Sequence, residues 1–457
     1  MKIIILGAGQ IGSNLAEYLV REGNEITVVD IASSNLNDLN MRLDIRTIEG
    51  KASHPSVLKK AGCKDADLLI AVTNSDEVNM LACEIAHTLF STPTKIARVR
   101  DNDYLARTEL FSEQAIRVDV TISPEQLVTD NIHRLFEFPG TLQVLDFAKG
   151  KVQLVAVKAI QDGPLVGKQL ASLKHHLPSV DTRVAAIYRR GEGISPRGDT
   201  VIETDDEVFF IASRQDTQAI MGELHKEEQG YRRVIIAGGG NIGERLANKL
   251  QGNHQVKLIE IDEKRCRGLA ERLTETVVLN GSATRKSLLV EENIDDCDIY
   301  CALTNDDEDN IMSSLLAKRL GAQKVLTLIN DPAYVDLIQG DKIDIAISPQ
   351  QVTIGSILTH IRRGDVAKVH SLRRGAAEAI EAVAHGDEGS SQVVGRKIGD
   401  IRLPAGTIIG AIVRGDEVIM GHTDAVIEAN DHLILFLIDK RRMREVERLL
   451  QVQITYF

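Results

Sequence analysis

Two glycine-rich stretches have the residue types and spacing to bind phosphate groups. The first is Gly7-Ala8-Gly9-Gln10-Ile11-Gly12, and the second is Gly238-Gly239-Gly240-Asn241-Ile242-Gly243. In a G-x-G-x-x-G turn the first glycine permits a tight bend, the second lets the backbone approach a pyrophosphate, and the third allows close helix packing. Each stretch follows an apolar run (3–6 and 234–237) and leads into a helical pattern. Both therefore predict phosphate-binding turns, with tight turns that bind no ligand as the alternative.

An acidic residue follows each glycine turn at a distance typical of a ribose ligand. Asp30 lies eighteen residues after Gly12, and Glu260 lies seventeen residues after Gly243. A carboxylate at this position accepts hydrogen bonds from free 2′ and 3′ hydroxyls and disfavours a 2′-phosphate. The acids therefore favour NAD+, NADH or adenosine nucleotides such as ATP and ADP over NADP.

Polar residues also end the fourth strand expected in each copy. They are Thr73 and Asn74 in the first copy, and Thr304 and Asn305 in the second. Ligands of a doubly wound sheet lie beyond the carboxyl ends of its strands, so these four side chains are expected to face the same crevice as the glycine turns. The alternative is that they only cap the following helix, although the two roles are compatible.

Arg98 is the cationic candidate of the first site. It ends the fifth expected strand, where its guanidinium can pair with a nucleotide phosphate or form a structural ion pair. The matching position of the second copy is assigned to Thr327, which carries no charge. The two sites are therefore expected to differ in affinity for phosphates.

The sequence lacks the motifs that carry most enzymatic chemistry. It has no P-loop, no nucleophile elbow and no zinc-ligand spacing. The acids at 76–77 and 306–308 favour the first turn of a helix over a metal site. A dehydrogenase needs a general acid or base in a domain after its cofactor domain, and the sequence there is turn-rich and generic. We predict binding without catalysis; the alternative is an NAD-dependent oxidoreductase with duplicated cofactor domains.

Composition narrows the class of partner. The chain has 457 residues, a net charge of -12, 4% aromatic residues and no Trp, which disfavours both general polyanion binding and base stacking on single-stranded nucleic acid. Five cysteines without CxxC spacing indicate reduced thiols. The apolar run 433–438 is far shorter than the ~20 residues of a membrane-spanning helix, so a membrane role is expected only through a partner.

The chain is a duplication. Shifting it by 231 residues aligns matching positions, namely Gly7 with Gly238, Gly12 with Gly243, Gly50 with Gly281, and Asp67 with Asp298. In each copy, short apolar strands alternate with amphipathic helices, which is typical of a doubly wound parallel sheet. In the first copy the strands are expected near 2–6, 25–30, 45–49, 67–72, 95–99 and 118–122. Short alternating strands at about 142–212 and 366–438 predict a small α+β domain after each sheet.

Two connecting helices carry apolar stripes that need a covering surface. They begin at Pro124 and Pro349, a residue type that favours the first helical position. The stripes are Val128, Ile132, Leu135 and Phe136 in the first helix, and Ile354, Ile357, Leu358 and Ile361 in the second. We expect self-association of chains to cover them.

Together, these motifs resemble tandem RCK (KTN) domains over the whole chain. The resemblance is carried by the two glycine turns, the acid after the second strand, the Thr-Asn blocks at 73–79 and 304–310, and the ISPxQ segments. The segment 371–388 also resembles a member of this family. The resemblance implies RCK N-terminal Rossmann domains at 1–123 and 232–348, and RCK C-terminal α+β domains at 143–227 and 368–453.

The resemblance also implies a function. RCK proteins of this kind form homo-oligomeric rings that bind NAD+, NADH and adenine nucleotides, and control the membrane subunit of a Trk-type potassium transporter. It implies a peripheral location on the cytoplasmic face of the inner membrane, and no nucleic acid. The positions carried over as ligand contacts are Gly7 to Ile11, Asp30, Thr73, Asn74 and Arg98, with Gly238 to Ile242, Glu260, Thr304 and Asn305.

Overall fold

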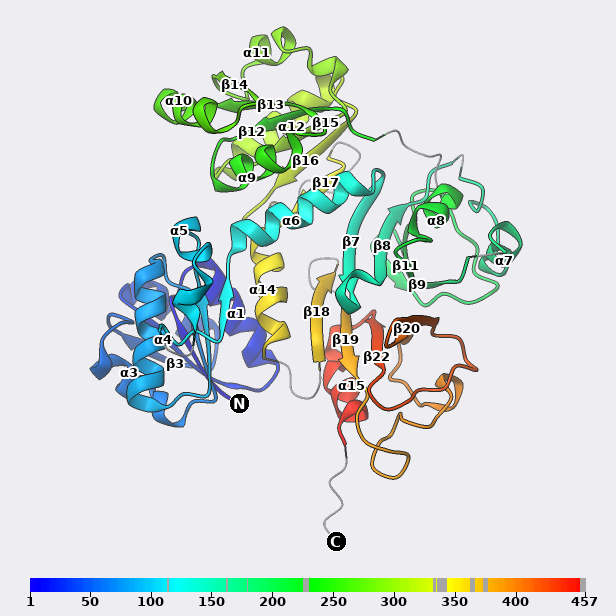
Figure 1. Cartoon of the computed structure of the whole chain (residues 1–457), viewed down its shortest axis with the longest axis horizontal. Coiled ribbons are helices and arrows are strands. Elements are labelled where there is room, and N and C mark those ends of the chain that lie inside the picture. The colour runs from blue at the N-terminus through cyan, green and yellow to red at the C-terminus, as the bar shows by residue number, and fades with distance from the viewer. Residues whose placement is uncertain are drawn as a thin grey trace. The chain divides into compact units, whose positions relative to one another are not determined.

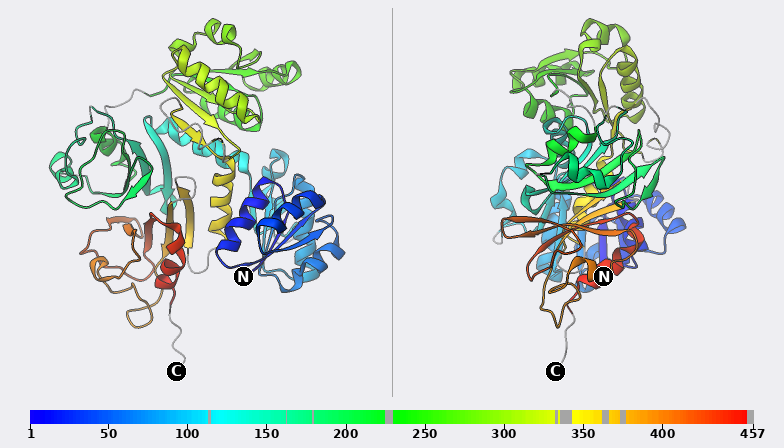
Figure 2. Two further views of the ribbon diagram at one scale, coloured as in Figure 1. Left: turned by 180° about the vertical axis from the view of Figure 1, so that it is seen from behind. Right: turned by 90° about the vertical axis from the view of Figure 1, so that its right-hand side faces the viewer.

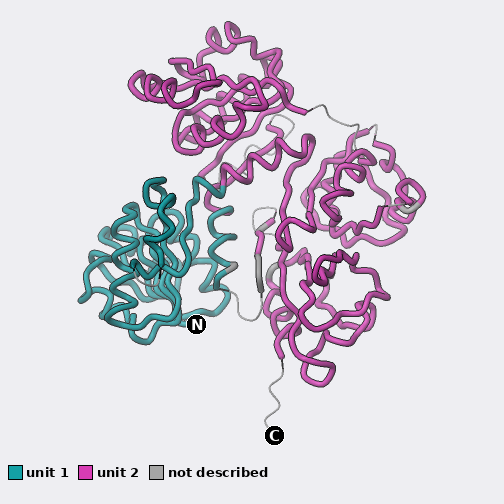
Figure 3. The backbone as a smooth tube through the Cα atoms, in the orientation of Figure 1, with its two compact units in different colours: residues 1–127, 352–361 teal, residues 128–351, 362–457 magenta. Residues whose placement is uncertain are grey.

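The chain folds into two compact units that do not follow the order of the sequence. The computed structural model describes residues 1–112, 115–161, 163–178, 180–224, 230–331, 334, 343–361, 366–372 and 377–452. Unit 1 combines residues 1–127 with 352–361, and unit 2 combines 128–351 with 362–457 (Figure 3). A segment from the second half of the sequence therefore belongs to the unit built by the first half.

A six-stranded parallel sheet of order β3-β2-β1-β4-β5-β6 forms the centre of unit 1. Its successive elements are β1 Lys2–Leu6, α1 Gln10–Arg21, β2 Glu25–Asp30, α2 Ser33–Arg42, β3 Arg46–Glu49, α3 Pro55–Ala61, β4 Leu68–Ala71, α4 Asp76–Phe90, β5 Thr94–Arg98 and β6 Val120–Ile122. Helices cover both faces of the sheet (Figures 1 and 2), because the strands are apolar on both sides. The strands expected from the sequence are confirmed.

A second sheet in unit 2 repeats this topology in the order β14-β13-β12-β15-β16-β17. Its elements are β12 Arg233–Ala237, α9 Asn241–Leu250, β13 Gln255–Glu260, α10 Glu263–Arg272, β14 Val277–Asn280, α11 Lys286–Glu291, β15 Ile299–Ala302, α12 Asp307–Leu320, β16 Lys324–Leu328 and β17 Ile345–Ile347. In both sheets the order reverses between the first and fourth strands, which is where ligands of doubly wound sheets bind.

The two connecting helices are exchanged between the copies within one chain. Helix α6 (Pro124–Glu137) follows the first sheet, and its Phe136 ring packs edge-on against Tyr231 and His254 beside the second sheet, at 5.4 and 5.5 Å between ring centroids. Helix α14 (Pro349–Thr359) follows the second sheet, and its Leu358 lies in the core of unit 1 beside α1.

This exchange corrects the expectation that the apolar stripes need a second chain. Within the single chain the exposed fraction is 0% for Val128 and Ile132 of the α6 stripe and 0% for Ile357 and Leu358 of the α14 stripe. The sequence shows that a stripe must be covered but does not show by what. The stripes therefore give no reason to expect self-association.

Each parallel sheet is followed by a five-stranded antiparallel sheet (Figure 1). The first comprises β7 Thr141–Phe147, β8 Val152–Lys158, β9 Thr182–Arg189, β10 Glu192–Ile194 and β11 Glu207–Ser213, with α8 Thr217–Leu224 after it. The second comprises β18 Val366–Leu372, β19 Ala377–Val383, β20 Thr407–Arg414, β21 Glu417–Met420 and β22 His432–Leu437, with α15 Met443–Leu450 after it. The fold class expected from the sequence, two doubly wound sheets each followed by a small α+β domain, is confirmed.

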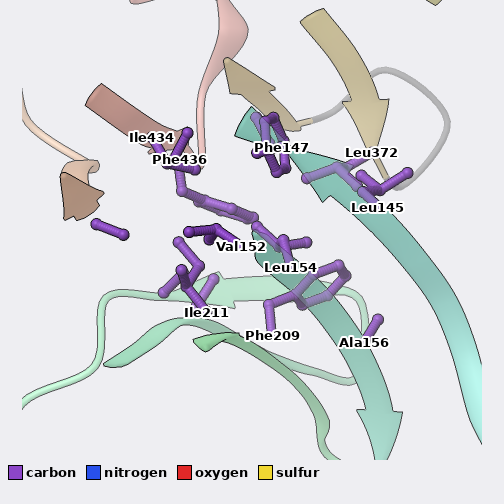
Figure 4. Packing of buried hydrophobic residues seen from close by; sticks show 14 of the residues in the cluster. Leu145, Phe147, Val152, Leu154, Ala156, Phe209, Ile211, Leu372, Ile434 and Phe436 are labelled. Carbon is purple, nitrogen blue, oxygen red and sulfur yellow. The ribbon is translucent and has the colours of Figure 1, made fainter. Parts of the chain in front are cut away.

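The two antiparallel sheets share one hydrophobic core, which the sequence did not reveal. Phe147, Leu154 and Phe209 of the first sheet pack with Ile434 and Phe436 of the second (Figure 4). The rings of Phe209 and Phe436 lie 5.7 Å apart between centroids. Residues of both sheets are therefore buried together in one cluster.

None of the helices that the structure describes combines the length and hydropathy needed to cross a membrane.

Candidate functional site

The first and third glycines of each turn are required by the backbone itself. Gly7 has φ +106°, and a Cβ there would lie 3.0 Å from the Val72 carbonyl oxygen. A Cβ on Gly12 would lie 1.9 Å from the Gly7 carbonyl oxygen, and one on Gly243 would lie equally close to that of Gly238. These glycines let the helix begin directly against the strand.

The middle glycine of each turn is not required by the backbone or by neighbouring atoms. Gly9 has φ -72° and ψ -175°, and Gly240 has φ -71° and ψ -174°, values open to any residue. A Cβ at either position would meet nothing within 4 Å. Each residue precedes a helix that has no side-chain cap, which leaves electropositive backbone amides suited to an anion.

The acids after the second strands hold the glycine turns in place. Asp30 accepts hydrogen bonds from the Ala8 amide at 2.5 Å and from the amide two residues beyond itself at 2.7 Å. Glu260 accepts from the Gly239 amide at 2.8 Å and from the amide two residues beyond itself at 2.9 Å. Each carboxylate oxygen keeps a further lone pair that can accept from a hydroxyl. The predicted ribose contact is therefore compatible with a structural role.

An exposed aliphatic residue follows each acid, and the sequence reasoning missed it. The exposed fraction is 70% for Ile31 and 72% for Ile261, although both are large apolar side chains. A flat apolar group bound beside the acid would cover them. The signal available in the sequence was the repetition of isoleucine immediately after the acid.

Thr73 and Thr304 take part in a repeated hydrogen-bond network at the end of the fourth strand. The Thr73 hydroxyl donates to the Asn79 side-chain oxygen at 2.7 Å, and the same amide accepts the Thr73 backbone N–H at 2.9 Å. Asn310 bonds Thr304 in the same way, at 2.7 and 2.8 Å. The network fixes the strand end to the following helix, so Asn79 and Asn310 are structural residues that the sequence reasoning did not single out. Asn74 and Asn305 lie exposed at this edge.

The same network corrects the assignment of Thr327 as the counterpart of Arg98. The Asn79 side chain donates to the Arg98 carbonyl at 2.9 Å, and the Asn310 side chain donates to the Leu328 carbonyl at 3.1 Å. Leu328 is thus the counterpart, and Thr327 corresponds to the residue before Arg98. The first copy still carries the only cation of the pair.

Arg98 forms an ion pair in this structure. Its guanidinium lies 3.6 Å from the Glu125 carboxylate, and both side chains are largely buried. Burial lowers the pKa of Arg98 below its usual value, and Glu125 opposes that shift. The residue aligned with Glu125 in the second copy is Gln350, so both members of the pair are uncharged there. The phosphate contact of Arg98 stays a prediction.

A buried acid fastens the loop after the fifth strand to the fourth helix. Asp76 accepts from the backbone amides of Arg100 and Asp101 at 2.7 and 2.8 Å, and pairs with the Arg100 side chain at 3.3 Å. Asp307 accepts from the amides of Asn330 and the residue after it in the second copy. The preference for helix acids over a metal site fits these contacts, and the residues that the structure describes include no metal-binding cluster.

Replacing Asp76 by alanine is expected to lower the free energy of unfolding of unit 1 by about 2–3 kcal/mol, because two backbone amides lose their acceptor. Urea unfolding followed by circular dichroism measures the change. The adjacent exposed Glu77→Ala variant is the control and should show no comparable loss. Equal stability of both variants would show that the buried contacts of Asp76 do not hold the loop.

The five cysteines lie in the described part of the chain and form no disulfide. All are buried as free thiols. Burial raises the pKa of Cys63 and Cys297 to about 12, so these thiols stay protonated at neutral pH. Reduced thiols stay a prediction, with which these burials agree.

Comparison with known proteins assigns the family. The TrkA-N domain model matches residues 3–124 and 234–349, and the TrkA-C domain model matches 154–225 and 387–451. The chain belongs to the TrkA family. A family member from Halomonas elongata, named Trk system potassium uptake protein TrkA, is 68% identical over 457 residues and covers 100% of both chains. The resemblance to tandem RCK domains is confirmed.

Solved structures with the same fold are more distant in sequence. The GsuK RCK domain superposes with a TM-score of 0.62 at 18% identity, covering 98% of this chain and 94% of that one. A structure of the GsuK channel bound to NAD gives a TM-score of 0.61 at 19% identity, covering 98% and 78%. These likenesses show that this chain shares the fold of those structures.

Proposed function

We propose that this chain is a nucleotide-sensing regulatory subunit of potassium uptake, with one nucleotide site in each half. The observation that carries the proposal is the free space beside Gly9 and Gly240. Each precedes a helix without a side-chain cap, and neither its backbone conformation nor any neighbouring atom among the described residues requires glycine there. A bound pyrophosphate would account for glycine at both positions. The naming of the Halomonas elongata relative as a potassium uptake protein supports the regulatory role.

The proposed ligand is NAD+ or NADH, with ATP or ADP as further candidates. Asp30 and Glu260 would accept the ribose hydroxyls, and Ile31 and Ile261 would cover the adenine. Thr73, Asn74, Thr304 and Asn305 would line the far side of the crevice. The GsuK channel, which shares the fold, is bound to NAD in one of its structures.

The proposed mode of action is binding without turnover. The regulated partner is a Trk-type transporter subunit in the inner membrane, and the chain would act from the cytoplasmic face as part of a homo-oligomeric ring. A ligand controls such an assembly only through different affinities for its two shapes. Calorimetric titration with NADH, combined with absorbance of the same sample, tests the proposal: binding with constant NADH is expected. Consumption of NADH with a small substrate would favour an oxidoreductase instead.

The first site is expected to hold nucleotide triphosphates more tightly than the second, because Arg98 has no cationic counterpart. Arg98→Leu is expected to lower the affinity of the first site for ATP by roughly tenfold, through loss of one charge-assisted contact. Adenosine, which lacks phosphates, should bind with unchanged affinity.

A matched variant separates this effect from the loss of the buried ion pair. The double variant Arg98→Leu with Glu125→Gln reproduces the pair found in the second copy and leaves no buried charge unpaired. Calorimetric titration with ATP, in chains whose second site is blocked, measures the affinity of the single and the double variant. ATP affinity that stays at the original value in the double variant would exclude Arg98 from phosphate binding.

A further inference from the structure

The helix that starts at each glycine turn packs against a connecting helix from the other half of the chain. In unit 2, α9 starts at Gly240, and Lys249 near its end pairs with Asp130 of α6. His254, just beyond α9, packs edge-on against the Phe136 ring. A displacement of α9 caused by ligand at its start would therefore act on these contacts with α6.

Helix α6 also contacts the first antiparallel sheet. Arg134 of α6 lies 3.2 Å from Asp146 of β7, on the turn of the helix next to Phe136. Asp146 is held from the other side by the buried side chain of Gln153, which donates at 2.9 Å. The chain itself also continues from α6 into β7. Helix α6 thus contacts both α9, which begins at the second glycine turn, and the sheet that belongs to the first half.

The same relation holds in reverse for the first site. Helix α1 starts at Gly9, and its buried residues Leu15 and Leu19 lie in one cluster with Leu358 and Ile361 of the α14 region. After this segment the chain enters β18 of the second antiparallel sheet. Helix α1, which begins at the first glycine turn, therefore packs in one cluster with the element that precedes the sheet of the second half.

We propose that the two sites are coupled crosswise, each to the antiparallel sheet of the opposite half. Ligand at the second site acts on β7, and ligand at the first site acts on β18. The inference rests on the proposed function, and it specifies how that function is transmitted. The two strands on which the ligands act are in contact with each other. The rings of Phe147 in β7 and His370 in β18 lie edge-on at 5.2 Å between centroids. The antiparallel sheet of each half therefore responds to ligand bound at the site of the opposite half.

Hydrogen exchange in the full chain, with and without NADH, tests the crossed pattern. Gly9→Asp blocks the first site and Gly240→Asp blocks the second. In the Gly9→Asp chain, NADH is expected to change exchange of β7 amides by roughly fivefold, at the lower end of usual coupling factors, and to leave β18 unchanged. In the Gly240→Asp chain the change is expected in β18 alone.

Two aligned residues serve as matched uncoupling variants. Phe136→Ala, in a chain with the first site blocked, is expected to keep NADH binding and lose the β7 response. Ile361→Ala, in a chain with the second site blocked, is expected to lose the β18 response only. Phe136→Leu keeps most of the buried volume, so it should restore part of the β7 response and shows whether the alanine variant has simply unfolded.

The outcomes separate this inference from the function on which it rests. Three outcomes would overturn the crosswise coupling and leave nucleotide binding intact. They are a response confined to the sheet of the same half, a response of both sheets to either site, and NADH binding without a response in either sheet. Absence of NADH binding to the unmodified chain would overturn the proposed function and this inference together.

Discussion

Replacement of Gly9 by aspartate is expected to abolish nucleotide binding at the first site and to leave the folded chain at least as stable. The backbone at Gly9 suits any residue, and a Cβ there meets nothing within 4 Å. Aspartate is also a favourable residue at a helix start, because its carboxylate accepts the orphan amides. That carboxylate would occupy the position proposed for the pyrophosphate. We expect at least about a hundredfold loss of NADH affinity, or ~2.7 kcal/mol.

The measurement is a calorimetric titration with NADH in chains that retain a single site. The single-site reference carries Gly240→Asp, and the test chain carries both substitutions. Thermal unfolding of the ligand-free chains should show equal or higher midpoints for the variants. Retained affinity in a chain with both substitutions would place the ligand elsewhere.

Truncation of Leu358 to alanine is expected to destabilise unit 1, although this residue lies in the second half of the sequence. Leu358 has an exposed fraction of 0% and packs in the cluster formed by α1 and the first parallel sheet. Removing a buried leucine side chain costs about 2–5 kcal/mol through lost transfer energy and the cavity left behind. Hydrogen exchange of β1 and β4 amides in increasing urea measures the loss where it is expected.

An exposed leucine in unit 1 provides the control. Leu89→Ala removes the same atoms from a side chain with an exposed fraction of 59%, so a far smaller effect is expected. Weakened protection of the second parallel sheet in Leu358→Ala, with the first sheet unchanged, would contradict the exchange of connecting helices.

Local patterns were sufficient to predict the parallel sheets and the glycine turns. Part of the steric reason for the turn from Gly7 to Gly12 is local, because Gly7 has a positive φ and a Cβ on Gly12 would meet the Gly7 carbonyl oxygen five residues earlier. Asp30 was predictable for a similar reason, since it ends the strand beside that turn. Contacts within one strand-turn-helix unit leave a signature in consecutive residues.

Contacts between distant segments left no such signature. The apolar stripe that contains Leu358 was visible, but its partner α1 lies more than 300 residues earlier. The 231-residue offset of the duplication does not hold at Arg98, because α12 is one residue shorter than α4, at 14 against 15 residues, which makes Leu328 the counterpart and the assignment to Thr327 wrong by one residue. The contacts of Asn79 with Arg98 and of Asn310 with Leu328 decide that alignment, and they are visible only in the folded structure.

The most direct test of the central claim is potassium flux through vesicles that contain a Trk-type transporter, with this chain added to the cytoplasmic side. With the unmodified chain, flux is expected to change when NADH is added, while the NADH concentration stays constant. With Gly9→Asp and Gly240→Asp combined, flux is expected to become independent of NADH. Equal and nucleotide-independent flux with both chains would contradict regulation by nucleotide binding.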